Sequence, residues 1–287
     1  MKYCLSVLSE IDSRLAGAAR ILVATDFDGT LCPIVETPSE ARLAPATIEI
    51  LRHVMACPQL TLAVISGRAL ADVRRRLPFD IVVAGNHGLE LAGGGLDFEH
   101  AGARDLRPML ARACEALTAL LRDWPAAWIE DKGLSATLHF RKVDPRNHNP
   151  LLFAARRALG GFGKQLALRA GKMALEVRPR VSWDKGSALG YIRENAGPFD
   201  ACICLGDDQT DESMFRANPG GVNIRIGCSI GTAASHYLAG PNEVAILLSH
   251  IVDVHGSEAR VPRTNPRASA HAATTGFPSL GAVAVSD

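Results

Sequence analysis

Two clusters of carboxylates in this chain have a spacing suited to phosphate chemistry. In the first, Asp26 and Asp28 stand in an Asp-Phe-Asp-Gly-Thr sequence and are separated by one residue, so both point to the same side of an extended chain. A carboxylate at the tip of a strand can attack phosphorus as a nucleophile. A second carboxylate can protonate the leaving oxygen and later activate water. Alone, the same pattern is also typical of a solvated turn.

The second cluster carries four carboxylates in the six residues 207–212, directly after the apolar run 201–205. Crowded carboxylates repel one another unless a cation lies among them. Mg²⁺ binds one or two protein carboxylates together with water and phosphate oxygens. The cluster therefore indicates a magnesium site, and the alternative is a capped helix start, since Asp and Thr are good N-caps.

Two further residues stand where they could hold a phosphate. Ser66 follows the apolar run 60–65, and a hydroxyl with nearby N–H groups at a strand tip can bind phosphate oxygens. Lys185 precedes a helical pattern, where an ammonium can neutralise both phosphate and nucleophile. Alone, each residue is also common in turns or on exposed surfaces.

The elements that must position these residues alternate along the chain. Short apolar runs predict buried strands at 21–25, 60–65, 81–84, 201–205 and 222–226. Helical patterns lie at 5–18, 45–56, 69–77, 186–195, 209–217 and 242–250. This alternation predicts an α/β fold with a parallel sheet covered on both faces. In such sheets ligands bind beyond the carboxyl ends of the strands, where the acidic clusters lie.

Residues 98–179 break this alternation and predict an inserted α+β domain. The segment reads as two α-β-β units, with helices at 103–123 and 149–159 and strands at 126–131, 134–141, 165–170 and 173–178. Such units favour helices on one face of a mainly antiparallel sheet. The core would then comprise 1–97 and 180–252. From about residue 254 the periodicity stops, so 253–287 is expected to be a disordered tail.

The composition of the chain limits the kinds of partner that it can bind. The 287 residues carry a formal net charge of +1, so no global field favours nucleic acid or an anionic membrane. The seven cysteines lack zinc-ligand spacing, and no signal peptide or spanning segment is evident. We expect a cytoplasmic protein. The oligomeric state stays open, with a monomer favoured.

The order of these motifs resembles the haloacid dehalogenase superfamily of phosphatases. That resemblance implies a Rossmann-like core, Mg²⁺ as cofactor and Asp26 as nucleophile, with Asp28 as general acid and base. It implies that Ser66 and Lys185 hold the phosphoryl group. The implied metal ligands are the Asp26 carboxylate, the Asp28 backbone carbonyl and Asp207, with Asp208 as a further ligand or support and Asp211 supporting the site.

Within that superfamily the chain looks like the trehalose-6-phosphate phosphatases. The similar segments are residues 26–34, 65–68, 85–90 (Gly-Asn-His-Gly-Leu-Glu), 130–133 (Glu-Asp-Lys-Gly), 139–141 (His-Phe-Arg), 175–179 (Leu-Glu-Val-Arg-Pro) and 206–212. The resemblance implies that the inserted domain caps the strand tips. Its implied sugar contacts are Glu130, Lys132 and Glu176 from the cap and Asn86 and His87 from the core, with Arg68 and Arg178 as further candidates.

The implied reaction is the hydrolysis of trehalose 6-phosphate, a small sugar phosphate. One alternative is another sugar phosphate, such as sucrose phosphate, glucosylglycerol phosphate or a mannosyl phosphate, because only the cap contacts would differ. A second alternative is a non-catalytic phospho-acceptor sensor. Asp28 and the cap argue against the sensor, which needs a long-lived acyl phosphate and no acid for a leaving group.

Overall fold

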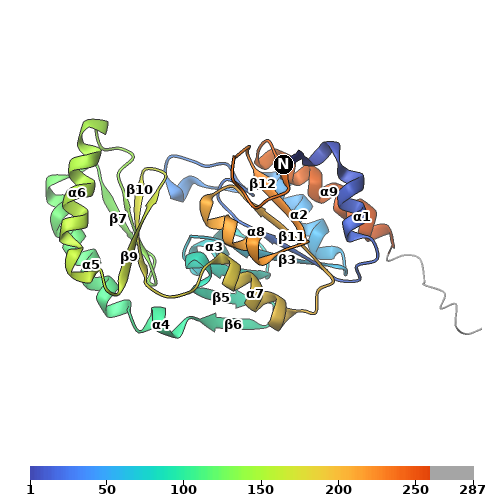
Figure 1. Cartoon of the computed structure of the whole chain (residues 1–287), viewed down its shortest axis with the longest axis horizontal. Coiled ribbons are helices and arrows are strands. Elements are labelled where there is room, and N and C mark those ends of the chain that lie inside the picture. Colours follow the sequence, from blue (N-terminus) through green and yellow to red (C-terminus); the bar gives the residue numbers. More distant parts are fainter. Residues whose placement is uncertain (259–287) are drawn as a thin grey trace, which may run out of the picture.

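The protein forms a nine-stranded sheet and a separate four-stranded sheet (Figure 1). The structure is a computed structural model that describes residues 1–258. In the large sheet, strands pair in parallel from β1 to β4 and antiparallel from β4 to β6. In spatial order they are β1 (Lys2–Tyr3), β13 (His236–Leu238), β12 (Val222–Ile226), β11 (Ala201–Gly206), β2 (Ile21–Thr25), β3 (Leu60–Ile65), β4 (Val82–Gly85), β5 (Glu90–Gly93) and β6 (Leu96–Glu99).

Helices cover both faces of this sheet, as the alternating pattern predicts. Along β2, Ile21 and Val23 pack into the layer of α1 (Leu8–Leu15), α2 (Pro45–Ala56), α3 (Leu70–Arg76) and α9 (Pro241–Glu258). Leu22 and Ala24 point to the other face and pack with α7 (Lys185–Ala196) and α8 (Glu212–Ala217). Because every residue of β2 is buried, its sequence is a continuous apolar run. The predicted α/β core is confirmed.

Three parts of the core differ from the sequence prediction. The edge strand β1 and its neighbour β13 have two and three residues and are too short to show a period. The predicted core segment ends at residue 97, whereas β6, which pairs with β5 in a hairpin that turns at the glycines 93–95, extends the large sheet to Glu99. Helix α9 continues to Glu258, eight residues past the predicted end, because Ile251 and His255 are buried. The rest of the predicted tail, 259–287, lies outside the described residues.

The smaller sheet belongs to the inserted segment, which we call the cap. Its antiparallel strands, in spatial order, are β7 (Trp128–Asp131), β8 (Ala136–His139), β10 (Ala174–Pro179) and β9 (Leu166–Gly171). Leu138, Leu175 and Val177 on one face pack under α5 (Arg107–Leu120) and α6 (His148–Ala158). The long helix predicted at 103–123 is divided into α4 (Ala101–Arg104) and α5, and a proline occupies the first turn of α5, where it is tolerated.

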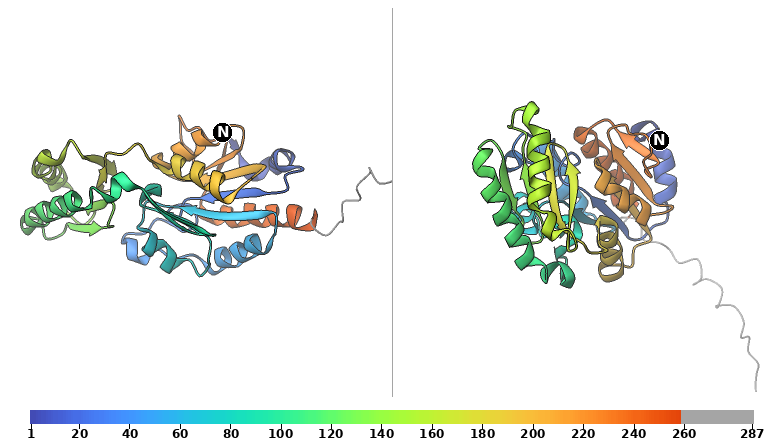
Figure 2. Two further views of the ribbon diagram at one scale, coloured as in Figure 1. Left: turned by 90° about the horizontal axis from the view of Figure 1, so that it is seen from below. Right: turned by 60° about the vertical axis from the view of Figure 1, so that its left-hand side comes forward.

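The opposite face of the cap sheet is turned toward the strand tips of the core. Figure 2 shows the cap beyond one end of the core rather than on a sheet face. Along β7, Ile129 packs into the cap interior, so its neighbours Trp128 and Glu130 point the other way, toward the core. The two sheets therefore enclose the site between them. Among the described residues, no helix combines the length and the apolar character needed to cross a bilayer.

Candidate active site

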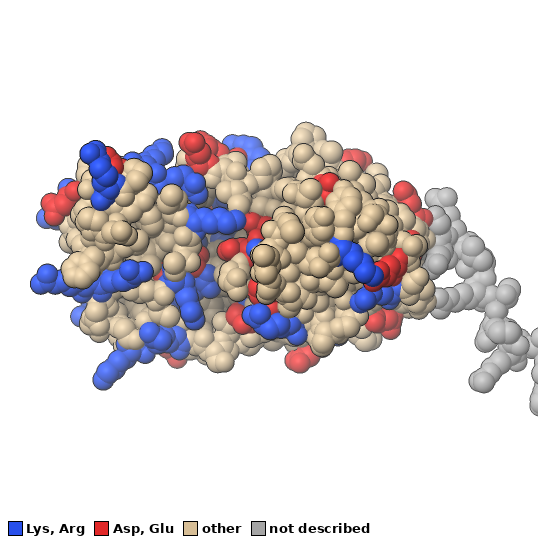
Figure 3. All heavy atoms as spheres, turned by 45° about the horizontal axis from the view of Figure 1, so that its top comes forward, with Lys and Arg blue, Asp and Glu red and all other residues tan. Residues whose placement is uncertain are grey.

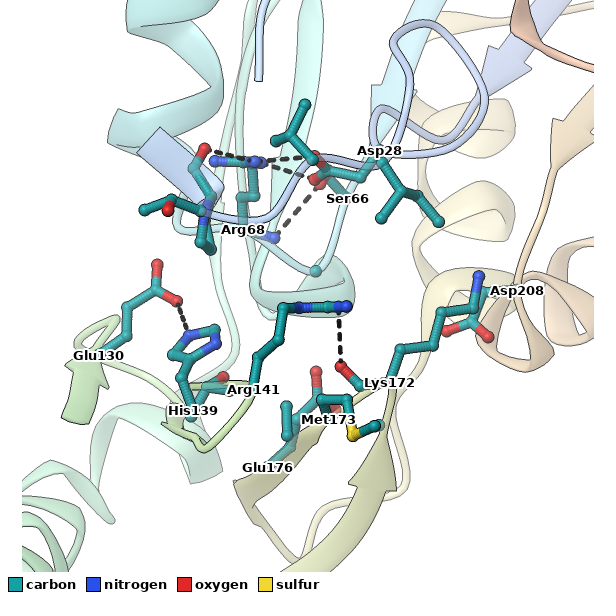
Figure 4. A pocket seen from close by; sticks show the side chains of 18 of the residues that line it. Asp28, Ser66, Arg68, Glu130, His139, Arg141, Lys172, Met173, Glu176 and Asp208 are labelled. Carbon is teal, nitrogen blue, oxygen red and sulfur yellow. Dashed lines mark hydrogen bonds and ion pairs between the residues drawn. The ribbon is translucent and has the colours of Figure 1, made fainter. Parts of the chain in front are cut away.

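A cleft of about 270 Å³ lies between the carboxyl ends of the core strands and the cap sheet (Figure 4). Core and cap both line it. The sequence-predicted residues in its wall are Asp26, Asp28, Ser66, Arg68, His87, Glu130, Lys132, Glu176, Lys185, Asp207 and Asp208. The structure thus brings together side chains as far apart in the sequence as Asp26 and Asp208. Asn86 and Arg178 are the two predicted site residues that do not line the cleft.

Buried charges surround the predicted nucleophile. The Lys185 ammonium donates to Asp26 Oδ1 at 2.7 Å and to Asp211 Oδ1 at 2.6 Å, and all three residues are almost fully buried. Burial raises the pKa of Asp26, although the adjacent Lys185 acts in the opposite direction. For Lys185, burial alone would lower the pKa, but the two carboxylates raise it. Lys185 is therefore a permanent cation between two carboxylates.

The same carboxylates form a group that could hold a metal ion. One oxygen each from Asp26, Asp207 and Asp211 lie within 4.8 Å of one another. Within the described residues, Asp207 Oδ1 is buried without a hydrogen-bond partner, and burial raises the pKa of Asp207. Gly29 lets the Asp207 carboxylate lie close to the backbone of the Asp26–Thr30 segment, because a Cβ at position 29 would lie 2.3 Å from Asp207 Oδ2. Three carboxylates against one ammonium leave two negative charges, and oxygen donors suit a hard divalent cation.

The acidic cluster differs in one member from the predicted ligand set. Asp208 lines the cleft but does not belong to the group of three, and Asp211 takes its place. Asp211 Oδ2 accepts from the Asp208 backbone N–H at 2.8 Å. Arg225, which sequence reasoning missed, donates to the backbone carbonyls of Asp207 and Asp208. These two bonds hold the backbone of the acidic loop in place. Arg225 is a single residue on a strand and belongs to no motif that sequence reasoning could have used.

Asp28, the predicted acid and base, is paired with Arg68. The Arg68 Nε and Nη2 groups donate to its two carboxylate oxygens at 2.6 and 2.7 Å (Figure 4). Nη1 of the same arginine donates to Asp72 at 2.7 Å, and Nη2 also reaches the Pro38 carbonyl at 2.8 Å. Arg68 is buried, so its donors are committed to the protein. In this structure Arg68 orients Asp28, and its predicted contact with the sugar stays a prediction.

The predicted cap residues reach into the site from neighbouring strands. Lys132 Nζ donates to the carbonyl of Gly67 at 3.1 Å, beside Ser66 in the loop after β3. Glu130 Oε2 accepts from His139 at 2.8 Å. Glu176 forms an ion pair with Arg178. Arg178 itself does not line the cleft, so it acts on the site through Glu176. Burial alone would raise the pKa of Glu176, but the adjacent His87, followed by Arg178 and Lys132, lowers it.

The two polar residues of the Asn-His-Gly turn have different surroundings: Asn86 bonds to the protein, and His87 lines the cleft. The side chain of Asn86 donates to Glu90 and to the Lys132 carbonyl and accepts from Ser135. These bonds tie the cap to the core, and the predicted sugar contact by Asn86 stays a prediction. His87 lines the cleft, and neither ring nitrogen hydrogen-bonds within the described residues; Nε2 lies 3.4 Å from Glu176. Burial lowers the pKa of His87 to about 4, so its imidazole is neutral near pH 7.

Cap cations face core carboxylates across the cleft. Lys172, in the β9–β10 turn, places its ammonium 3.1 Å from Asp207 Oδ2. Arg141 from the segment after β8 donates to the Lys172 carbonyl at 3.4 Å. Figure 3 shows blue side chains of the cap opposite red side chains of the core at this hollow. Sequence reasoning did not select Lys172, because a turn lysine has no distinguishing pattern.

Comparisons with known proteins agree with this geometry. Residues 24–237 match the family model described as trehalose-phosphatase. The chain belongs to the trehalose-phosphatase family. A probable trehalose-phosphate phosphatase of Oryza sativa is 32% identical over 262 residues, covering 87% of this chain and 70% of that protein. The family and this site make the chain a phosphatase, a phosphoric monoester hydrolase.

Two other matches differ in how much of the matched protein they cover. An uncharacterized glycosyl hydrolase of Mycobacterium tuberculosis is 40% identical over 222 residues; the match covers 74% of this chain but only 16% of that protein. The crystal structure of a trehalose-6-phosphate phosphatase related protein superposes with a TM-score of 0.73 at 25% identity. That match covers 83% of this chain and 99% of the other. The core-plus-cap arrangement is thus shared with a solved relative.

Proposed function

We propose that this phosphatase hydrolyses trehalose 6-phosphate to trehalose and phosphate through an aspartyl-phosphate intermediate. The observation that carries the proposal is the buried Asp26–Lys185–Asp211 network at the base of a cleft whose other wall presents the family's cap residues Glu130 and Glu176. Such a cleft suits a ligand with a dianionic end and a polar, uncharged body.

In the first step, an Asp26 carboxylate oxygen attacks phosphorus, and the bond to the sugar oxygen breaks. Asp28, when protonated, gives its proton to that oxygen, so trehalose leaves as a neutral alcohol. In the second step, Asp28 takes a proton from water, whose oxygen attacks phosphorus and releases Asp26. Lys185 and Ser66 stabilise the charge on the phosphoryl oxygens throughout.

The acidic cluster fits a resident Mg²⁺. Asp26 and Asp207 would hold it, with the Asp28 backbone carbonyl as a third donor and with Asp208 and Asp211 as neighbours that help to fix the loop. When bound, the ion would shield the phosphate charge from the anionic nucleophile. The unpartnered Asp207 Oδ1 and the excess of carboxylates over ammonium groups at this site support the proposal.

The sugar would bind on the cap face. Ionised Glu130 and Glu176 can accept from sugar hydroxyls, and Lys132 can donate to them. His87 supports this assignment, because it lines the cleft beside Glu176 and neither of its buried ring nitrogens has a hydrogen-bond partner among the described residues. Leaving such atoms unpaired is costly, so a hydroxyl that satisfies them adds both affinity and selectivity. We also propose that the protein lies in the cytoplasm, because its seven free cysteines suit a reducing environment.

A substrate panel with and without chelator tests the proposal. We expect phosphate release from trehalose 6-phosphate to exceed that from sucrose 6-phosphate, glucosylglycerol phosphate and mannose 6-phosphate, and to stop in EDTA. Asp26→Asn should abolish turnover. Asp97→Asn, on exposed strand β6, should leave it unchanged.

Each failure would have a distinct meaning. A preference for another member of the panel would overturn the substrate. Normal turnover by Asp26→Asn would overturn the mechanism. A single stoichiometric burst of phosphorylation without further turnover would favour a sensor.

A further inference from the structure

We infer that Trp128 forms a stacking platform for the sugar ring farther from the phosphate, and so selects disaccharide phosphates over monosaccharide phosphates. This inference rests on the proposed function and concerns the same cleft. It follows from the alternation along β7, from the exposure of the indole and from the contacts that hold the ring in place.

Strand β7 presents a row of side chains to the cleft. Trp128, Glu130 and Lys132 alternate with residues of the opposite face and all line the cleft. Lys132 reaches the carbonyl of Gly67 beside the predicted phosphate site, so it marks the phosphate end of the row. Trp128 lies four residues away, or about 13 Å along the strand at roughly 3.3 Å per residue. A ligand that spans the row needs two sugar rings.

Trp128 is exposed, although a tryptophan normally buries most of its surface. Its side chain is 42% exposed in the cleft wall. One face of the indole stacks on His139, the cross-strand neighbour, with ring centroids 4.2 Å apart and an interplanar angle of 15°. The exposed part of the indole lies in the cleft wall, where a ligand can reach it. A pyranose ring offers a flat patch of C–H groups that matches an aromatic face.

The indole is held in place before any ligand arrives. His139, which covers its inner face, is itself fixed by the 2.8 Å bond to Glu130 (Figure 4). Pre-orientation of this kind lowers the entropy lost on binding. Across the cleft, the core loop after β2 presents Ile34, which is 48% exposed and lines the same cavity. The cleft thus has an exposed apolar side chain in each wall, in addition to its charged groups.

Steady-state kinetics of the full chain test the inference. Trp128→Ala should lower kcat/KM for trehalose 6-phosphate by about tenfold, the upper range of an aromatic contact, chiefly through KM. The change for glucose 6-phosphate should stay below about twofold. Trp128→Phe should recover most of the loss. Phe153→Ala, which removes a 71% exposed aromatic from α6 outside the cleft, is the matched control and should behave as wild type.

The two proposals fail in different measurements. The ranking of substrates by the wild type tests the proposed function; the ratio of variant to wild type tests Trp128. If sucrose 6-phosphate is the better substrate, the same loss should appear there, and the role of Trp128 stands without trehalose. An unchanged kcat/KM for the preferred disaccharide phosphate, or an equal loss for glucose 6-phosphate, would overturn the inference. If Phe153→Ala lowered kcat/KM as much as Trp128→Ala, the inference would also be overturned, since any change in the cap would then have the same effect.

Discussion

Replacing Lys185 by Met should destabilise the protein in a way that depends on pH and on Mg²⁺. Lys185 is the only cation within hydrogen-bond distance of both Asp26 and Asp211 among the described residues. Removing one partner of a buried ion pair typically destabilises a protein by about 3–5 kcal/mol, because the remaining charge stays buried. We therefore expect a loss of that size in the free energy of unfolding at pH 7 with EDTA present.

The pH dependence follows from proton binding. Burial raises the pKa of Asp26 in the folded protein, and the loss of Lys185 removes the group that opposes this rise. A carboxylate whose folded pKa lies above its unfolded value contributes less stability as the pH rises. The difference between variant and wild type should therefore grow with pH, by at most about 1.4 kcal/mol per pH unit for a single proton. Mg²⁺ should shrink the difference, since it supplies the missing positive charge.

Urea unfolding followed by circular dichroism, at three pH values and with either EDTA or Mg²⁺, measures these effects. Lys164→Met, at an exposed cap position, controls for loss of a lysine and should be neutral. A destabilisation that is constant with pH, or a stabilisation by Mg²⁺ that is equal in wild type and variant, would show that charge balance does not govern this site.

Three further changes probe the surroundings of the site. Lys172→Ala removes an exposed ammonium that competes for Asp207, so a Mg²⁺ activation curve should shift to lower concentration by up to about fivefold; a shift to higher concentration would contradict this. Gly67→Ala places a Cβ 2.5 Å from the His87 ring, and thermal unfolding should show a loss of about 1–3 kcal/mol together with a raised KM. Although burial alone would raise it, Arg76 and Arg68 lower the pKa of Asp72 to about 2. Asp72→Asn should thus lose about 2 kcal/mol near pH 7, and the loss should fade as the pH falls from about 4 toward 2.

The chemistry at the strand tips could be predicted from the sequence because local patterns encode it. The Asp-Phe-Asp-Gly-Thr run and the 206–212 cluster each follow a buried strand, and parallel strands must bring their carboxyl ends to one edge. The period of two along residues 130–132 likewise placed Glu130 and Lys132 on one face of a cap strand. These inferences needed no knowledge of how the cap sits on the core.

What could not be predicted depends on contacts between distant segments. Asn86 and Arg178 belong to family motifs, yet here their donors are used by Lys132 and Glu176, and sequence order does not reveal such partners. Lys172 reaches Asp207 only because a cap turn lies over a core loop. The edge strand β1 and its neighbour β13 are too short for any periodic signal, and only their pairing in the sheet defines them.

The division of charge between the two sheets gives the cap a role beyond covering the site. In the core, the strand tips hold three carboxylates and a single lysine, an excess of negative charge that would repel a phosphate dianion. The cap wall supplies Lys132 and Lys172, which reach the phosphate loop and Asp207 respectively. Because attraction between such groups strengthens when water is excluded, cap position and metal occupancy should be coupled. A substrate that adds negative charge at the core should draw the same lysines inward, whereas a neutral product should not.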